Sequence, residues 1–335
     1  MKRWLLTAIS FAAVLGVSVY AVLSGAPHDV DLAIPFRAHL LAFAAFVAEV
    51  VARSLKLTWN AKAVGIELPF TTAVRTSLGG DFGAAITPAR MGAEPARFLI
   101  LAEAGIVASN AMVILFCELF FEVLSLAIVV IGVTVIFKAS SNASLAMFGV
   151  VGGYALFVLG LGALGVILSR RTVGEEPPPW ARTFRVHGKR WEIVQRWFVR
   201  LRLTVDAFKR MRYGWAVLSL LASVVHIAVR FTILPVIVYS MTTATVPLAP
   251  LVVWPLGIIF GGAIVPAPGG GGAVELVFRA TLGHVIPPDA FAASLVWWRF
   301  YTFYIYIAFG ALVAGNTALR AIREAEEIEE ELERA

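Results

Sequence analysis

The sequence has little charge and a single cysteine. Charged residues make up 15% of its 335 residues, whereas soluble domains carry nearer a quarter. Because Cys117 stands alone, a disulfide within the chain and a cysteine-based metal cluster are both excluded. The scarcity of charge accompanies 59% hydrophobic residues and a mean hydropathy of +0.83, more apolar surface than a soluble domain of this size can bury. We therefore expect a polytopic membrane protein.

Patterns that mark common enzyme classes are also missing. The sequence has no GxSxG, HExxH, P-loop or CxxC motif, and its five histidines are scattered. Asp29, Asp31 and Asp81 are too sparse for the acidic metal cluster of a polyprenyl-linked transferase. We therefore expect no catalytic residue, no metal site and no cofactor, and no use of a nucleotide.

Apolar runs of about 20 residues, the length that spans a bilayer, recur along the chain. They predict helices over 4–23, 34–54, 105–137, 145–169, 213–241 and 290–319. The first run also fits a signal peptide, and we interpret it as a retained helix. Two further apolar regions, about 68–104 and about 248–285, are interrupted, and each predicts a re-entrant pair of short helices.

The basic residues indicate how these helices are oriented. They precede the first run (Lys2 and Arg3), follow the second (Arg53, Lys56, Lys62 and Arg75) and crowd 170–212, whereas 24–33 and 242–250 contain none. Because basic loops stay in the cytoplasm, both termini are expected there. The formal charge of +6 is then explained by membrane contact, and we expect no nucleic acid partner.

This topology divides the chain into two repeats. Residues 1–137 and 138–319 each contain three spans and one re-entrant pair, and an odd number of spans inverts the second repeat. Residues 170–212 read either as an amphipathic helix on the membrane surface or as an ordinary basic loop with aromatic anchors. Residues 320–335 read as an acidic extension of the last helix.

The interruptions carry helix-breaking residues at corresponding places in the two repeats. The first, 86–97, reads ITPARMGAEPAR, and the second, 265–275, reads VPAPGGGGAVE. Irregular backbone survives in hydrocarbon only where it is packed or lines a wet cavity, and broken segments in both halves point to a transport site. The predicted breaks and hinges are Pro88, Gly92, Pro95, Pro266, Pro268, Gly269, Gly270 and Gly272.

Ionisable residues within or beside apolar segments are the candidate binding residues. A charge at the bilayer centre costs at least about 2.5–3.5 kcal/mol, so such groups pair or face a cavity. The candidates are Arg90, Glu94, Arg97, Arg230, Glu275, Arg279 and Arg299. Arginine outnumbers glutamate among them, and its planar fork suits phosphate oxygens, so we expect an anionic headgroup, foremost a phosphate diester.

A structural role remains open for several of these residues. Glu94 with Arg97, and Glu275 with Arg279, have the spacing of ion pairs within a helix. Glu118 and Glu122 favour partners at a helix interface, and His226 is either a packed histidine or a proton-coupling group. Asp81 reads as a helix cap, and the glycine run as a binding turn or simply a tight one.

The two broken motifs resemble the family named for the transmembrane region of lysylphosphatidylglycerol synthase, also found in the multiple peptide resistance factor. The first pattern is matched by Thr87, Pro88, Arg90, Gly92, Glu94, Pro95 and Arg97, with Ala93 in place of a second glycine. The second is matched by Pro266, Pro268, Gly269, Gly270, Gly272 and Glu275, and Arg299 before Tyr301 resembles the family's closing arginine.

The resemblance implies a flippase-like lipid transporter of the bacterial inner membrane. Expected partners are an anionic phospholipid or a polyprenyl-linked lipid and the membrane itself, with a homo-oligomer and a separate lipid synthase left open. The rival interpretations are a membrane enzyme acting on a lipid-linked sugar and a lipid-binding scaffold that transports nothing.

Overall fold

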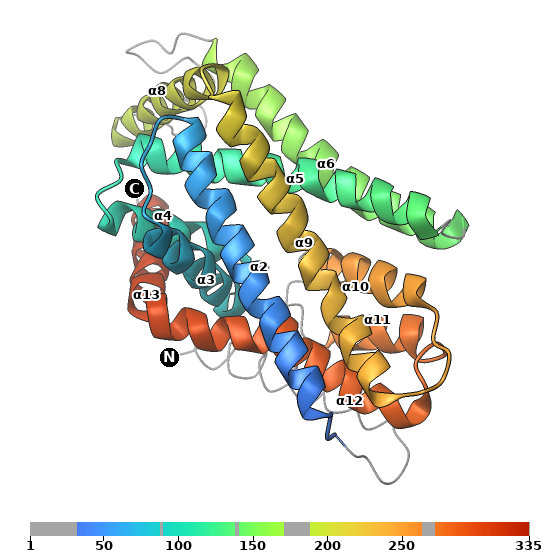
Figure 1. Cartoon of the computed structure of the whole chain (residues 1–335). Coiled ribbons are helices and arrows are strands. Elements are labelled where there is room, and N and C mark those ends of the chain that lie inside the picture. Colours follow the sequence, from blue (N-terminus) through green and yellow to red (C-terminus); the bar gives the residue numbers. More distant parts are fainter. Residues whose placement is uncertain (1–31, 88–89, 138–140, 171–187, 263–271, 335) are drawn as a thin grey trace.

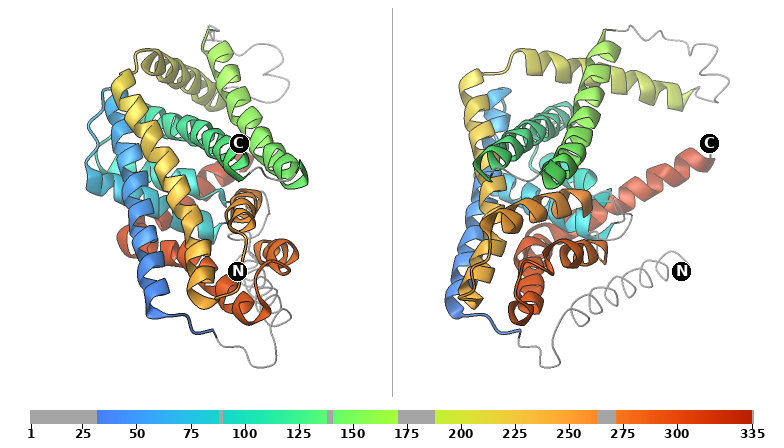
Figure 2. Two further views of the ribbon diagram at one scale, coloured as in Figure 1. Left: turned by 45° about the vertical axis from the view of Figure 1, so that its right-hand side comes forward. Right: turned by 90° about the vertical axis from the view of Figure 1, so that its right-hand side faces the viewer.

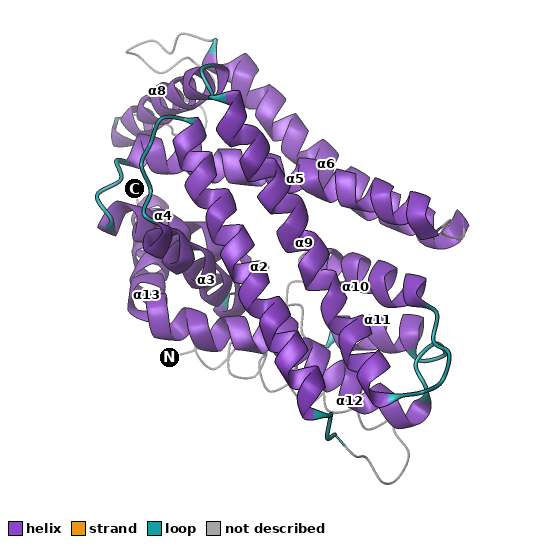
Figure 3. Ribbon diagram, in the orientation of Figure 1, coloured by secondary structure: helices purple, strands orange, loops and turns teal. Residues whose placement is uncertain are grey.

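The structure is a computed structural model that describes residues 32–87, 90–137, 141–170, 188–262 and 272–334. All regular structure among these residues is helical (Figure 3), as the sequence predicts. In chain order the elements are α2 (Phe36–Ala63), α3 (Phe70–Ile86), α4 (Ala93–Glu103), α5 (Ala108–Phe137), α6 (Ser141–Ser169), α8 (Lys189–Lys209), α9 (Tyr213–Met241), α10 (Leu248–Gly262), α11 (Ala273–Leu282), α12 (Pro288–Arg299), the π-helical turn Phe300–Tyr304 and α13 (Ile305–Arg334). The first predicted span, 4–23, lies outside the described residues.

Several helices are long and apolar enough to cross a membrane. Within the described residues these are α5, α9 and the stretch Pro288–Thr317, which runs through α12 into α13. Their bounds agree closely with the predicted spans. Large apolar side chains point outward from the fold, among them Leu156, Val135, Ile136 and Leu312 at 71–81% exposure, and such a surface suits lipid rather than water. The chain is a multi-pass membrane protein.

Helices α2 and α9 lie side by side and run in opposite directions (Figures 1 and 2). The pair is held by apolar packing and by small polar contacts such as Ser219 Oγ donating to the carbonyl of Lys56 at 3.0 Å. Helix α2 continues to Ala63, nine residues beyond the predicted end of that span. Lys56, which lay beyond the predicted end of the span, is therefore inside the helix with Arg53, and both are buried.

Helices α3 and α4 pack against each other as a hairpin whose break lies between Ile86 and Ala93. The break is closed locally: Thr87 Oγ1 donates to the carbonyl of Gly83 at 2.7 Å and accepts the N–H of Gly92 at 2.8 Å. A Cβ on Gly83 would lie 2.4 Å from the Gly92 carbonyl oxygen, so the close approach of the two arms requires glycine. Pro88 lies outside the described residues.

Helices α10 and α11 also pack against each other, and in Figure 1 they lie on the same side of α9 as α5 and α6, toward the C-terminal end of α9. The residue before α11 is its N-cap, Gly272, which has a φ of 79°, a value that favours glycine. The Gly272 N–H donates to Glu275 Oε2 at 2.7 Å, which caps the first turn. Pro266, Pro268, Gly269 and Gly270 lie outside the described residues.

The last helices form one long rod that is interrupted by the π-helical turn. Helix α12 ends at Arg299, the turn Phe300–Tyr304 follows, and α13 then packs on α3 and α4. The acidic tail continues α13 as far as Arg334. The rod therefore connects the neighbourhood of the second hairpin with that of the first (Figure 1).

Helix α8 occupies part of the basic segment 170–212. It packs on α5 and α6 and buries Trp191 and Val205, while Val199 and Leu203 are exposed among arginines. Residues 189–209 of the segment are thus helical, and contact of this helix with the membrane surface stays a prediction. Trp180 and Phe184, which the sequence assigned to the same helix, lie outside the described residues.

Candidate functional site

A small pocket lies where the two hairpins meet the long rod. Its volume is about 40 Å³. Its lining comprises Asp81, Ala84 and Ala85 of α3, Arg90 of the first break, Arg230 of α9, Ile259 of α10, Val274 of α11, and Arg299, Thr302, Phe303, Tyr306 and Ile307 of the rod. Because α3 and Arg90 belong to one hairpin and α10 and α11 to the other, both broken segments contribute to one site, which we call the arginine pocket.

The π-helical turn positions two arginines. Arg299, its N-cap, lies with its guanidinium carbon 4.5 Å from the centre of the Phe303 ring, and its Nε donates to Glu275 Oε1 at 2.8 Å. The turn widens the helix and leaves the carbonyl of Thr302 able to accept from Arg230 Nη2 at 2.7 Å. Such turns are enriched at functional sites.

Arg230 also faces a buried carboxylate. Its Nη1 lies 3.6 Å from Oε1 of Glu49, a fully buried residue of α2, and its guanidinium carbon lies 5.0 Å from the centre of the Tyr306 ring. The Tyr306 hydroxyl donates to Glu49 Oε2 at 2.8 Å. Glu49 and Tyr306 thus fix the arginine that enters the pocket from α9.

Arg90 enters the pocket from the first break in a left-handed backbone conformation. Its φ is 60°, the one positive φ outside glycine in the described residues, and such a residue stores about 1–3 kcal/mol of strain. Arg90 makes no ion pair with any described carboxylate. Asp81, the acidic residue of the lining, is held instead by Arg53 Nη2 at 2.5 Å.

The charge of the pocket is therefore positive. Asp81 is the single carboxylate of its described lining, against Arg90, Arg230 and Arg299. The ion-pair partners outside the lining do not change this sign. Three carboxylates face three guanidinium groups, and Arg90 is one more positive charge; the carboxylates are those of Asp81, Glu49 and Glu275, and the guanidinium groups are those of Arg53, Arg230 and Arg299. A site of this charge attracts an anion, and arginine suits phosphate oxygens.

A second set of buried charges lies between α2, α4, α5 and α9. We call Lys56, Arg97, Glu118, Glu122 and His226 the buried ion-pair network. Lys56 bonds Glu122 and lies 3.5 Å from Glu118, and Arg97 Nη1 lies 3.4 Å from Glu118 Oε2. Arg97 crosses α3 at Gly80, where a Cβ would lie 2.3 Å from its Nε. Each carboxylate of this network has a cation within reach.

A family model described as the lysylphosphatidylglycerol synthase TM region matches residues 4–310. The chain belongs to this family. The match contains both hairpins, every lining residue of the arginine pocket and the whole buried ion-pair network. No curated protein matches the chain.

In this member of the lysylphosphatidylglycerol synthase TM region family, the candidate residues fall into groups according to whether they line the arginine pocket. Arg90, Arg230 and Arg299 line the arginine pocket, and Glu275 supports it through Arg299. Arg97 pairs instead with Glu118 and, at 3.3 Å, with the largely exposed Glu94. Arg279 is half-buried at the end of α11 and is absent from the lining.

The structure corrects the predicted roles of two acidic residues, Asp81 and Glu275. Asp81 is not a helix cap: it lies inside α3, faces the pocket and pairs with Arg53. Glu275 does not form the expected pair with Arg279 among the ion pairs of the described residues, because its carboxylate turns to Arg299 and to the N–H of Gly272. The expected pair of Glu94 with Arg97 and the helix-interface partners of Glu118 and Glu122 are present.

Three residues at the site were missed from the sequence. Glu49 lies within the apolar run 34–54, and its charge there was a usable signal. Lys56 was counted with a loop, and the charges around it hid the continuation of α2. Tyr306 carries no charge, so nothing in the sequence distinguished it from other aromatic residues of the last span.

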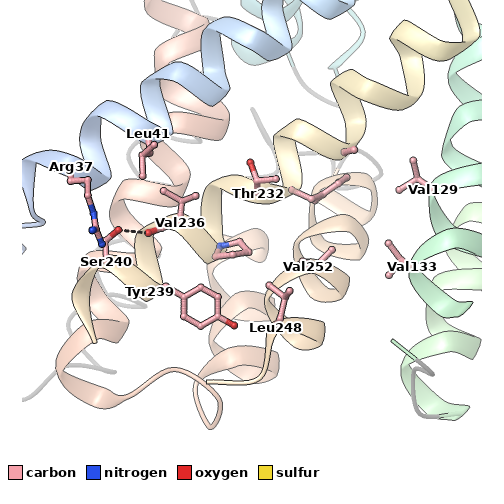
Figure 4. A pocket seen from close by; sticks show the side chains of 13 residues that line it. Arg37, Leu41, Val129, Val133, Thr232, Val236, Tyr239, Ser240, Leu248 and Val252 are labelled. Carbon is pink, nitrogen blue, oxygen red and sulfur yellow. Dashed lines mark hydrogen bonds between the residues drawn. The ribbon is translucent and has the colours of Figure 1, made fainter. Parts of the chain in front are cut away.

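An apolar pocket with a volume of about 450 Å³ lies on the far side of α9 from the arginine pocket. Its walls come from α2, α5, α9 and α10, with Leu41, Val129, Val133, Val236 and Val252 around it (Figure 4). Arg37 lies at the α2 edge and Thr232 within the wall. Phe231 lines this pocket and its neighbour Arg230 lines the other, so the two pockets meet different faces of the same turn of α9.

Proposed function

We propose that this chain binds the phosphate group of an anionic lipid in the arginine pocket and moves that headgroup across the bacterial inner membrane. The observation that carries the proposal is the convergence of Arg90, Arg230 and Arg299 from three separate elements on one pocket with a single, already paired carboxylate. Guanidinium groups within a membrane protein are costly without a functional reason. Membership of the lysylphosphatidylglycerol synthase TM region family supports the same conclusion.

The proposed architecture is an inverted repeat of residues 1–137 and 138–319, followed by the extension 320–335. In this arrangement α3–α4 re-enters from the cytoplasm and α10–α11 from outside, and both termini are cytoplasmic. The contact of both hairpins with one pocket supports it, since transporters of this kind bind substrate between their repeats. Pro88, Gly92, Pro95, Pro266, Pro268, Gly269, Gly270 and Gly272 act as breaks and hinges.

Transport requires the hairpins to move apart. The space of about 40 Å³ that is open to the centres of water molecules holds only a few waters, since one water needs about 10–15 Å³ of such space, and it is small for a phosphodiester. The described conformation is thus a closed one. Separation of the α3–α4 hairpin from α11 opens the pocket, and the headgroup then meets the three arginines.

The apolar pocket favours a lipid over a free anion. A hollow of about 450 Å³ with apolar walls, one helix away from the arginine pocket, accommodates part of an acyl chain while the headgroup lies beyond α9. The substrate class is an anionic phospholipid or a polyprenyl-linked lipid, supplied by a separate synthase. An enzyme acting on a lipid-linked sugar fits less well, because the described lining offers no second carboxylate for acid–base catalysis.

The test uses the purified chain reconstituted into phosphatidylcholine vesicles with a trace of fluorescent phosphatidylglycerol. Dithionite quenching of outer-leaflet dye reports leaflet exchange. We expect the native protein to exchange the dye, and Arg299→Gln and Arg230→Gln to lower the rate at least about tenfold, since hydrogen bonds to charged groups contribute about 1.5–3 kcal/mol each. Arg75→Gln, which changes an exposed arginine paired with Glu103, is the matched control.

The vesicle assay also separates the rival functions. Equal exchange in the native protein, Arg299→Gln and protein-free vesicles would exclude translocation. Binding of the labelled lipid without exchange would favour the scaffold interpretation, and a chemically altered lipid recovered from the vesicles would favour the enzyme.

A further inference from the structure

His226 lies between two buried carboxylates that belong to different helices. Its Nε2 is 3.2 Å from Glu122 Oε2 of α5, and its Nδ1 is 3.6 Å from Glu49 Oε1 of α2. The histidine side chain is 5% exposed and Glu49 is fully buried. Neither Nδ1 nor Glu49 Oε1 has a hydrogen-bond partner among the described residues. The imidazole thus joins the arginine pocket to the buried ion-pair network.

The chemistry of imidazole makes this position sensitive to a proton. A neutral imidazole carries one N–H and donates to one acceptor, whereas the protonated ring donates from both nitrogens. Between two carboxylates, a neutral ring directs a lone pair at one of them. One added proton converts that repulsion into a second charge-assisted hydrogen bond.

His226 and an arginine of the pocket both approach the same carboxylate, that of Glu49. Lys56 is shared by Glu118 and Glu122, and Arg53 is shared by Glu49 and Asp81. Arg230 makes its ion pair with Glu49 alone and also lines the pocket. When Arg230 turns to an anion, Glu49 loses a cation, and a proton on His226 replaces it.

Among the described residues, the charged groups that face this position come from the helices packed around it, and Arg97 of α4 reaches Glu118 from further away. Helix α2 contributes Glu49, Arg53 and Lys56, helix α5 contributes Glu118 and Glu122, and α9 itself contributes Arg230. Tyr306 of α13 reaches Glu49, and Arg299 at the end of α12 lines the pocket beside Arg230. Helix α10 contains no titratable residue.

We propose that His226 is a proton-binding site that couples lipid transport to the proton gradient, with one proton carried for each anionic headgroup. The inference rests on the proposed lipid transport. Proton and anion favour each other's binding, because each relieves the other's competition for Glu49, and such coupling is reciprocal. The proton enters through Glu122, whose side chain is 22% exposed, and passes to Nε2. Cotransport of a proton with a singly charged lipid moves no net charge.

The experiment uses the same vesicles, loaded with a pH-sensitive dye, with a pH gradient or a potassium diffusion potential imposed separately. We expect the gradient to redistribute the fluorescent phosphatidylglycerol between leaflets, by up to about tenfold per pH unit for one-to-one coupling. We expect the potential alone to have no effect. Lipid movement should be accompanied by acidification on the side that receives the lipid.

Variants identify the proton site. His226→Gln should abolish the redistribution that the gradient drives while retaining downhill exchange, and Glu122→Gln should weaken it. His284→Gln, which changes an exposed histidine between α11 and α12, should behave as the native protein. Should His226→Gln fail to fold, the native response to gradient and not to potential, together with Glu122→Gln, supports the coupling.

Each failure has a distinct meaning. Native exchange that ignores the pH gradient, or a His226→Gln protein that still follows it, would overturn proton coupling and leave lipid transport standing. Redistribution by the potential would overturn the one-to-one electroneutral mechanism. Absence of exchange in the native protein would overturn both the coupling and the transport on which it rests.

Discussion

The arginine pocket and the buried ion-pair network use the same residue types for different purposes. In the network each carboxylate has a cation within reach, and Lys56 and His226 are almost completely buried. In the pocket the guanidinium groups exceed the carboxylates, and Arg90 has no acidic partner among the described residues. Matched charges hold helices together, whereas unmatched charges are available to a ligand.

The first broken motif contains both cases. Arg90 and Arg97 lie in the same short segment, but Arg90 sits before α4 in a left-handed conformation and enters the pocket. Arg97 lies within α4 and crosses α3 to reach Glu118. A shared motif therefore does not give its two arginines a shared role.

The largest effect is expected from removing the central cation of the network. Lys56→Met leaves Glu118 and Glu122 with like charges one turn apart, and breaking a buried ion pair on one side costs about 3–5 kcal/mol. Thermal unfolding in detergent should show a large loss of stability. The control is Lys62→Met, which removes a cation 4.8 Å from the Trp215 ring and should cost about 0.5–1 kcal/mol. Equal losses in both variants would contradict the assignment of Lys56 to the network.

A second pair of variants separates the two arginines of the first motif. Arg90→Gln should lower lipid exchange roughly tenfold or more, since about 1.4 kcal/mol of lost anion binding corresponds to tenfold, and should leave the unfolding temperature unchanged. Arg97→Gln should lower the unfolding temperature and leave lipid exchange unchanged, because it removes one of the two cations, Arg97 and Lys56, that hold the buried Glu118. Exchange and unfolding temperature are measured on the same preparations. Loss of exchange in Arg97→Gln at full stability would show that the division between pocket and network is wrong.

A smaller effect is expected from Tyr306→Phe, which removes the hydrogen bond from the Tyr306 hydroxyl to Glu49. The hydroxyl bonds Glu49, but Glu49 retains Arg53, Arg230 and His226, so the loss should be about 1 kcal/mol, within the range of a single hydrogen bond. Thermal unfolding provides the measurement. The control is Tyr304→Phe, because the Tyr304 side chain is partly exposed. A greater loss of stability in Tyr304→Phe than in Tyr306→Phe would contradict a role for Tyr306 in the site.

The sequence predicts the parts of this molecule that depend on composition. Continuous apolar residues define α5 and α9 almost to the residue, and a charge inside such a run is conspicuous, so Arg230 and Arg299 were identified at once. The broken motifs likewise disclosed Arg90. These signals are local, because the cost of placing an arginine in an apolar segment does not depend on the rest of the fold.

The parts that depend on partners distant in sequence could not be predicted. Lys56 appeared to end a span, since the two glutamates that bury it lie 62 and 66 residues further along the chain. Asp81 resembled a cap until Arg53 of another helix was placed beside it. The π-helical turn has no sequence signature here. Pairing across helices therefore decides which charges remain for a ligand, and the sequence alone does not reveal that pairing.

The smallest effect is expected from filling the apolar pocket, which tests whether an acyl chain uses it. Ala228→Leu adds bulk to a wall of that pocket two residues from Arg230, without altering any charge. We expect exchange of long-chain phosphatidylglycerol to fall about two- to threefold, which corresponds to less than 1 kcal/mol, while a short-chain analogue is unaffected. Val217→Leu, on the outward face of α9, is the control. Equal rates for both chain lengths in Ala228→Leu would confine the lipid contact to the arginine pocket, and the comparison would then concern charge alone.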